Sequence, residues 1–191
     1  MIADVSGKGI PASLFMMNSK VLIKSYASGD NSPAEVLEKV NKEICENNQM
    51  EMFITVWLGV LELSTGKIVA SNAGHEYPVI GRAGGKYELI KDKHGFVVGG
   101  MEGVKYKDYE MQLQPGDKLF VYTDGVPEAA NTKNELFGTD RMLVELNKDI
   151  YAPVEELLRN VRGEVSEYAA GAEQFDDLTM LAVEYIGTGT K

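Results

Sequence analysis

The chain has 191 residues, 44% of them hydrophobic and 25% charged, and this composition excludes a disordered protein because a core can form. Its 29 acidic and 19 basic side chains give a net charge of -10, which argues against nonspecific binding to nucleic acid or to an anionic membrane. The single cysteine, Cys45, cannot form an internal disulfide, and no apolar run reaches the roughly 18 residues of a membrane-spanning helix. We therefore expect a cytoplasmic protein with no nucleic-acid or membrane partner.

The N-terminal part of the chain predicts a short strand, two helices and a hairpin. Pro11 suits the first turn of a helix, and Ser32 and Glu35 form a capping box at the start of another. The apolar, β-branched runs that follow are typical of strands. The elements expected here are a strand over residues 2–4, helices over 11–28 and 33–47, and strands over 53–63 and 68–72.

The C-terminal part predicts further hairpins, two helices and a closing strand. The expected strands are 79–80, 87–90, 106–113, 118–123 and 178–186, and the expected helices are 139–148, with Thr139 as its cap, and 153–170. Because strands are segregated from helices and joined by tight turns, the pattern indicates an α+β fold and not a doubly wound parallel sheet. We expect a single domain over residues 1–187 and a disordered tail over 188–191.

Several residues are assigned to the core or the surface and not to a site. Apolar residues of the first helix are expected to form a buried face, and methionines are expected to fill the core. His75 and His94 are isolated in the sequence, so no zinc site is predicted, and the segment 72–75 is expected to shape a turn. The residues predicted to be buried include Leu14, Met16, Met17, Val21, Ile23, Cys45 and Trp57.

The stretch 2–12 (IADVSGKGIPA) joins a strand that ends in Asp4 to a glycine-rich turn, and it has three interpretations. A dinucleotide-binding fingerprint would need a strand after the helix, but a second helix follows here. A phosphate-binding P-loop would need Ser or Thr directly after Lys8, which is followed by glycine. The third interpretation is a metal site, with Asp4 as a ligand beside the carbonyl of Val5.

Aspartates recur at the ends of apolar strands. Asp124 follows the predicted strand 118–123 at a glycine turn, and Asp176 and Asp177 directly precede the last strand. Each alone is explained as a turn former, but carboxylates that converge with Asp4 at one rim would repel one another. Hard cations such as Mg²⁺ or Mn²⁺ offset that repulsion most simply. Two such ions would lower the pKa of a bridging water and make a hydroxide for in-line attack on a phosphate ester.

These segments give the chain a family resemblance. It resembles the metal-dependent PPM-type (type 2C) serine/threonine protein phosphatases, and in particular their SpoIIE-like bacterial branch. The matching segments follow the family's order and cover almost the whole chain. They are residues 2–12 (IADVSGKGIPA), 71–75 (SNAGH), 114–117 (QPGD), 122–129 (YTDGVPEA), 135–138 (ELFG) and 176–179 (DDLT).

The resemblance implies a four-layer α-β-β-α sandwich of mostly antiparallel sheets flanked by helix pairs. It implies two bound ions, Mn²⁺ or Mg²⁺. Asp4, Asp124 and Asp176 would be both the metal ligands and the catalytic residues, and the carbonyl of Val5 would be a further ligand. Three further residues are assigned secondary roles. Asp177 would support the ligands, Gly125 would let the backbone come close to the metal, and Lys8 would approach the substrate phosphate.

The resemblance also implies a biological setting. The substrate would be a phosphorylated anti-anti-sigma factor in a bacterial partner-switching pathway, and an upstream sensor or regulatory domain would control the helix pair at residues 11–47. Family members have strands before the opening stretch that carry a further metal-binding aspartate. We therefore expect a truncated domain with weakened metal binding and weak activity. The unpaired sheet edge favours a homodimer, and the alternative function is a catalytically impaired signalling or dimerisation module.

Overall fold

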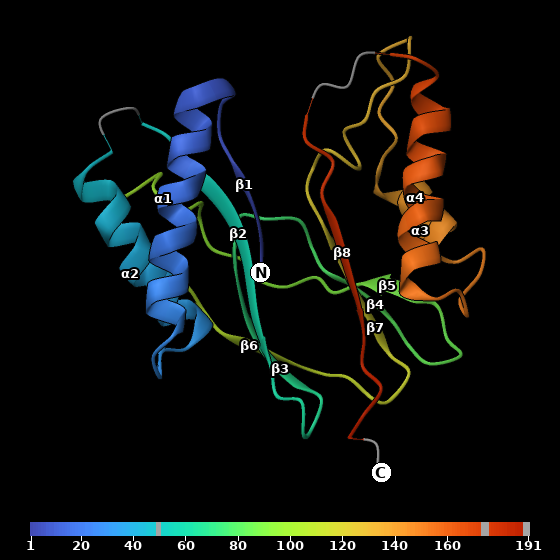
Figure 1. The fold of residues 1–191 in the computed structure, drawn as a ribbon, viewed down its shortest axis with the longest axis horizontal. Coiled ribbons are helices and arrows are strands. Elements are labelled where there is room, and N and C mark those ends of the chain that lie inside the picture. Colours follow the sequence, from blue (N-terminus) through green and yellow to red (C-terminus); the bar gives the residue numbers. More distant parts are fainter. Residues whose placement is uncertain (49–50, 173–175, 189–191) are drawn as a thin grey trace. The chain divides into compact units, whose positions relative to one another are not determined.

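The structure is a computed structural model that describes residues 1–48, 51–172 and 176–188. The chain divides into two compact units (Figure 1). Unit 1 comprises Met1–Glu62, Lys67–His75 and Asp92–Gln112, and unit 2 comprises Leu63–Gly66, Glu76–Lys91 and Leu113–Lys191. The predicted tail residues 189–191 lie outside the described part of the chain.

Unit 1 is an antiparallel sheet with a helix pair on one face (Figure 1). The strands follow the order β1-β2-β3-β6. The elements are β1 (Ile2–Val5), α1 (Gly9–Ala27), α2 (Pro33–Glu46), β2 (Ile54–Leu61), β3 (Lys67–Ala73) and β6 (Tyr109–Gln112). The core lies between the helices and β2, where Leu37 and Val40 of α2 pack with Val56. Trp57 is buried as predicted, and its indole donates a hydrogen bond to the hydroxyl of Tyr109 (2.7 Å).

The start of α2 confirms the predicted capping box. The hydroxyl of Ser32 accepts a hydrogen bond from the backbone N–H of Glu35, and the Glu35 carboxylate accepts one from the N–H of Ser32. A third N–H of this first turn, that of Ala34, donates to Asp108 (2.8 Å). The first backbone N–H groups of a helix have no acceptor within the helix, and here side chains supply the acceptors. The helix α2 therefore begins at the residue that the sequence predicts.

The buried face of α1 includes Ile23, as the sequence predicted, but not the other residues predicted for it. Ala12, Ser19 and Ile23 are buried, whereas Leu14, Met17 and Val21 are each at least 60% exposed and lie on the opposite side of the helix. Met16 is also exposed, so the assignment of these methionines to the core is wrong. Since α1 is apolar around most of its circumference, helical spacing alone could not select the face that packs against the sheet.

Unit 2 repeats the arrangement of one sheet and one helix pair (Figure 1). The strand order is β5-β4-β7-β8, and every pairing is antiparallel. The elements are β4 (Val79–Gly81), β5 (Tyr87–Leu89), β7 (Lys118–Tyr122), α3 (Thr139–Leu146), α4 (Val154–Ala169) and β8 (Met180–Glu184). Phe120 and Tyr122 of β7 pack against Val161 of α4 in the core. The two units together confirm the predicted α+β class.

The beginning of α3 differs from the sequence prediction. Thr139 is the first helical residue and not the cap. The cap position is held by Gly138, which has no side chain that could accept a hydrogen bond from the helix. The backbone of Gly138 has φ of +80°, a conformation that glycine adopts readily and threonine does not. The chain therefore turns one residue earlier than the capping preference of threonine suggests.

A turn before β7 is fixed by the buried carboxylate of Asp117. It accepts hydrogen bonds from the N–H groups of Gln114 and Ala83, each 2.9 Å long. It also forms an ion pair with the guanidinium of Arg82 at 2.6 Å. Burial by itself would raise the pKa of Asp117, but these hydrogen bonds outweigh it and hold the pKa below its usual value. The carboxylate thereby ties the end of β4 to the start of β7.

Among the described residues, the helices are too short or too polar to cross a lipid bilayer.

Candidate metal centre

Asp124 is held in place by the residue before it. Thr123 is buried at the end of β7 and bonds to the segment that leads into β8. Its hydroxyl donates to the carbonyl of Asp177 (2.9 Å) and accepts from the N–H of Thr179 (3.0 Å). Because these bonds join two segments more than 50 residues apart, they place Asp124 beside Asp176 and not merely on the same sheet.

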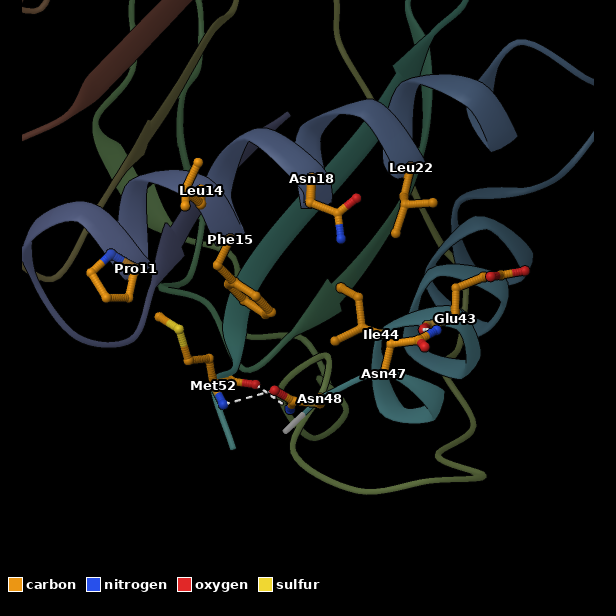
Figure 2. Close-up of a pocket in the computed structure, with 10 residues that line it drawn as sticks. All are labelled: Pro11, Leu14, Phe15, Asn18, Leu22, Glu43, Ile44, Asn47, Asn48 and Met52. Atoms are coloured by element: carbon orange, nitrogen blue, oxygen red, sulfur yellow. Dashed lines mark hydrogen bonds between the residues drawn. The ribbon is translucent and has the colours of Figure 1, made fainter. Parts of the chain in front are cut away.

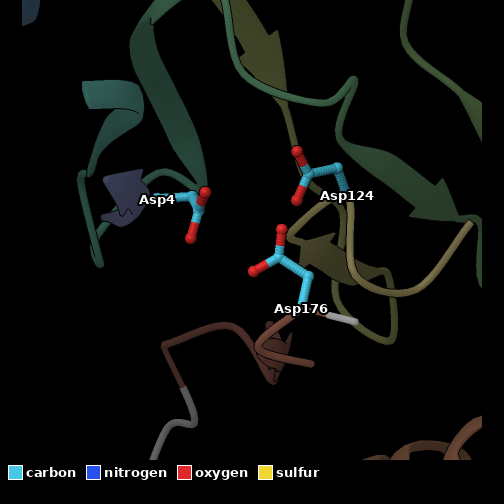
Figure 3. A group of neighbouring side chains, drawn as sticks. All are labelled: Asp4, Asp124 and Asp176. Carbon is cyan, nitrogen blue, oxygen red and sulfur yellow. The ribbon is translucent and has the colours of Figure 1, made fainter. Parts of the chain in front are cut away.

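Asp124 and Asp176 form a close carboxylate pair in unit 2. One carboxylate oxygen of each lies within 4.8 Å of the other, and Figure 3 shows the two groups facing the same space. The Oδ1 atom of Asp124 is buried and has no hydrogen-bond partner among the described residues. A buried, unsatisfied carboxylate oxygen beside a second carboxylate is costly unless a cation is bound, so the pair fits a hard metal ion.

The electrostatics of unit 2 agree with that geometry. Burial, and next the charge of Asp176, raise the pKa of Asp124. Burial, and then the charges of Asp124 and Asp176, also raise the pKa of Glu128. The negative potential is therefore concentrated at the ends of β7 and β8, where a divalent cation would be stabilised.

Gly125 has a clear spatial role. A Cβ atom at this position would lie 2.5 Å from the carbonyl oxygen of Asp177 and 2.9 Å from its carbon. Glycine therefore lets the segments that carry Asp124 and Asp177 approach each other. The sequence had attributed this glycine to a close approach of the backbone to the metal, and the contact that the structure shows is with Asp177.

Replacing Gly125 with alanine is expected to push the two segments apart. The clash is with backbone atoms, which cannot rotate away, so we expect a loss of about 2 kcal/mol in the free energy of unfolding. Urea denaturation measures this loss, and the matched control is Gly163→Ala, where a Cβ meets nothing within 4 Å. Equal stabilities of G125A and the wild type would contradict the close contact.

Unit 1 carries Asp4, which Figure 3 labels. It lies at the end of β1, opposite Thr55 of β2, and Val5 lies opposite Ile54. The glycine turn after it is confirmed, since Gly7 has φ of +83°. Lys8 is exposed at the cap position of α1, which suits the predicted approach to a phosphate.

A buried polar cluster supports the strand opposite Asp4. The N–H of His75 donates to the side-chain oxygen of Asn72 (2.8 Å), and the Asn72 amide donates to Asp92 (3.1 Å). The Nδ1 atom of His75 shares a hydrogen bond with the hydroxyl of Thr55 (2.8 Å). The predicted turn at residues 72–75 is thus present, and its contact with Thr55 is one that sequence reasoning missed.

Unit 1 also has a groove of about 550 Å³ between α1 and α2 (Figure 2). Phe15 and Ile44 line it from the two helices, and Met52 lines it from the segment after α2. Its one titratable lining residue among those described is Glu43. A groove with a single ionisable group has no acid–base pair, so it does not compete with the aspartates as a site of chemistry.

Comparison with known proteins gives one consistent answer. The model of the family described as Stage II sporulation protein E (SpoIIE) matches residues 1–186. The chain is 29% identical to Protein IcfG of Synechocystis sp. over 96% of this chain and 33% of that protein. It is 28% identical to the phosphoserine phosphatase RsbU of Bacillus subtilis over 84% of this chain and 48% of that protein. The chain therefore spans a third to a half of these curated relatives.

Solved structures show the same fold. The SiaA-PP2C domain of Pseudomonas aeruginosa superposes with a TM-score of 0.83 at 21% identity, covering 95% of this chain and 73% of that domain. At this level of identity the likeness concerns the fold, and it agrees with the α+β architecture of both units.

Proposed function

Because the chain belongs to the family of Stage II sporulation protein E (SpoIIE), we propose that it is a metal-dependent phosphoserine/phosphothreonine protein phosphatase. The observation that carries this proposal is the close pair Asp124 and Asp176, with a buried carboxylate oxygen that has no hydrogen-bond partner in the described part of the chain. The likeness to RsbU, which is named a phosphoserine phosphatase, supports the reaction and the phosphoserine substrate.

The donor set is suited to Mn²⁺ or Mg²⁺. Asp124 and Asp176 offer carboxylate oxygens from unit 2, and we propose that Asp4 and the carbonyl of Val5 complete the site from unit 1. Hard oxygen donors of this kind favour these two cations over zinc or copper. When bound, a pair of such ions supplies a water of lowered pKa as the nucleophile and neutralises charge on the phosphate.

The remaining roles belong to the protein. Thr123 fixes the direction of Asp124, and Gly125 allows the close approach of the segment with Asp176 and Asp177. Lys8 would orient the phosphate from the N-terminal end of α1, where the peptide dipoles also favour an anion. In this proposal the phosphoryl group passes directly to water, with no covalent intermediate on the protein.

We propose further that the substrate is a phosphorylated protein of the anti-anti-sigma-factor type and that a sensor or regulatory domain controls the enzyme. Both ideas rest on the family resemblance. The likeness to RsbU supports them, because that phosphatase matches this chain over only 48% of its own length and so has room for further segments.

The test is hydrolysis of a phosphoserine peptide with and without Mn²⁺. We expect turnover with Mn²⁺, loss of turnover with EDTA and recovery when Mn²⁺ is restored. Isothermal titration with Mn²⁺ should show binding that Asp124→Asn weakens. A wild-type titration no stronger than that of the variant would overturn the proposal and favour a signalling module without a metal.

A further inference from the structure

A second hollow in unit 1 gathers exposed apolar side chains from distant segments. Its volume is about 630 Å³, and Phe53, Phe96 and Met101 line it. These side chains are 40%, 53% and 58% exposed. Single exposed apolar residues are ordinary, but large ones that converge on one concavity indicate a surface that a ligand covers.

The loop that presents Phe96 and Met101 is fixed by a buried polar side chain. Asn41 of α2 is 1% exposed, and its carbonyl oxygen accepts a hydrogen bond from the N–H of Gly99 (2.8 Å). Its amide donates to the carbonyl of Met101 (2.9 Å). A buried carboxamide used in this way holds the loop in one conformation, so the exposed side chains are displayed and not merely loose.

The charged side chains that line the hollow are acidic. Glu51 and Glu102 line it, and no lysine, arginine or histidine does so among the described residues. Cys45 lies among the lining residues, and burial, followed by the charge of Glu102, raises the pKa of its thiol. The hollow is therefore complementary to an apolar side chain that has a basic neighbour.

The hollow lies at the same end of the sheet as Asp4. Phe53 precedes β2 and pairs with Ser6, whose N–H donates to the carbonyl of Phe53 (2.8 Å) and whose hydroxyl accepts from the Phe53 N–H (2.9 Å). Ser6 directly follows β1 and lies two residues beyond Asp4, a distance of about 7 Å at the most. One polypeptide segment could therefore reach both Asp4 and the hollow.

From this placement we propose that the hollow of Phe53, Phe96 and Met101 is a specificity subsite for the phosphoprotein substrate. It would accept one apolar side chain, next to a lysine or arginine that faces Glu51 and Glu102. At about 3.3 Å per extended residue, that side chain lies about two to four residues from the phosphoserine. This inference rests on the proposed function, and it adds what the enzyme recognises around the phosphate.

The test uses phosphoserine peptides that carry one Phe–Arg pair at different distances from the phosphate, with Ala–Ala peptides as the reference. The wild type should show a kcat/KM about 10-fold higher for the preferred spacing, as expected when a phenylalanine side chain is buried. Met101→Ser and Phe96→Ser should each remove most of that preference. Met17→Ser is the matched control, because Met17 is 60% exposed on α1 and does not line the hollow.

Reversing the charge of Glu102 tests the preference for a basic residue independently. Glu102→Lys should lower the preference for Phe–Arg and raise that for Phe–Glu, while hydrolysis of p-nitrophenyl phosphate, which has no peptide, stays at the wild-type rate. A wild type with no preference for an apolar residue, or a preference that survives M101S and F96S, would overturn the subsite.

Binding can be followed without turnover. With ¹³C-methyl methionine labelling, the Phe–Arg peptide should shift the Met101 resonance, assigned with Met101→Leu, and leave that of Met17 in place. If p-nitrophenyl phosphate and all peptides remained unhydrolysed, the proposed phosphatase would fail, and the Met101 signal would still decide whether the hollow binds the peptide. An unshifted Met101 resonance at saturating peptide would reject the subsite.

Discussion

Asp124→Asn is expected to lower the Mn²⁺-dependent hydrolysis of a phosphoserine peptide by at least about 100-fold, equivalent to about 2.7 kcal/mol in the activation free energy. The amide keeps the shape of the side chain but removes the negative charge opposite Asp176. In the proposed mechanism, a divalent ion would then be held less tightly and would stabilise less charge on the phosphate. The measurement is kcat across a Mn²⁺ titration, which separates a lost ligand from a slower chemical step.

The matched control is Asp140→Asn, which makes the same chemical change at an exposed aspartate in the first turn of α3. Its rate should stay within about twofold of the wild type, because surface substitutions away from a site have small effects. Asp176→Asn should resemble Asp124→Asn. If both variants kept the wild-type rate at saturating Mn²⁺, the carboxylate pair would not be the metal site.

Asp117→Ala is expected to reduce the free energy of unfolding by about 3 kcal/mol. The change leaves the N–H groups of Gln114 and Ala83 and the guanidinium of Arg82 without their shared acceptor. Arg82 is half exposed and can turn to water, so the two backbone donors account for most of the loss. Urea denaturation at pH 7 measures it, with the exposed loop residue Asp30, changed to Ala, as the control.

The pH dependence of that difference has a definite sign. The folded protein holds the pKa of Asp117 below its usual value, so the contribution of the carboxylate is fully present above the unfolded pKa of about 4. It is lost as the pH falls through the lower folded pKa. The stability gap between wild type and D117A should therefore be constant near neutrality and narrow below about pH 4. A gap that widened on acidification would contradict the assignment.

The sequence predicted best where the determining contacts are local. The capping box of Ser32 and Glu35 spans three residues, and the glycine turn after Asp4 needs only its own backbone conformation. The pattern that selected the three aspartates is also local, since Asp4 and Asp124 stand where an apolar strand ends and Asp176 stands just before the last strand. The metal-binding, catalytic and supporting roles all stay predictions, as does the single domain over residues 1–187. They were assigned to Asp4, Val5, Lys8, Asp124, Gly125, Asp176 and Asp177.

Long-range contacts account for what the sequence missed. Thr123 positions Asp124 through a bond to a carbonyl 54 residues away, and Asn41 fixes a loop through Gly99, 58 residues away. No spacing rule encodes such partners. The face of α1 that packs inward was also undetermined, because both faces are apolar and only the sheet beneath decides between them.

By itself, the sequence determined the α+β class, the order of helices and strands, the family and the aspartates that could bind metal, because these follow from periodicity, turn chemistry and short motifs. Only the tertiary structure decided that Asp124 and Asp176 meet, that Gly125 is required by the carbonyl of Asp177, and that exposed apolar residues gather in a hollow near Asp4. The physical reason is that proximity between segments far apart in the chain depends on how whole strands and helices pack. That packing is a property of the folded chain and not of any short stretch of it.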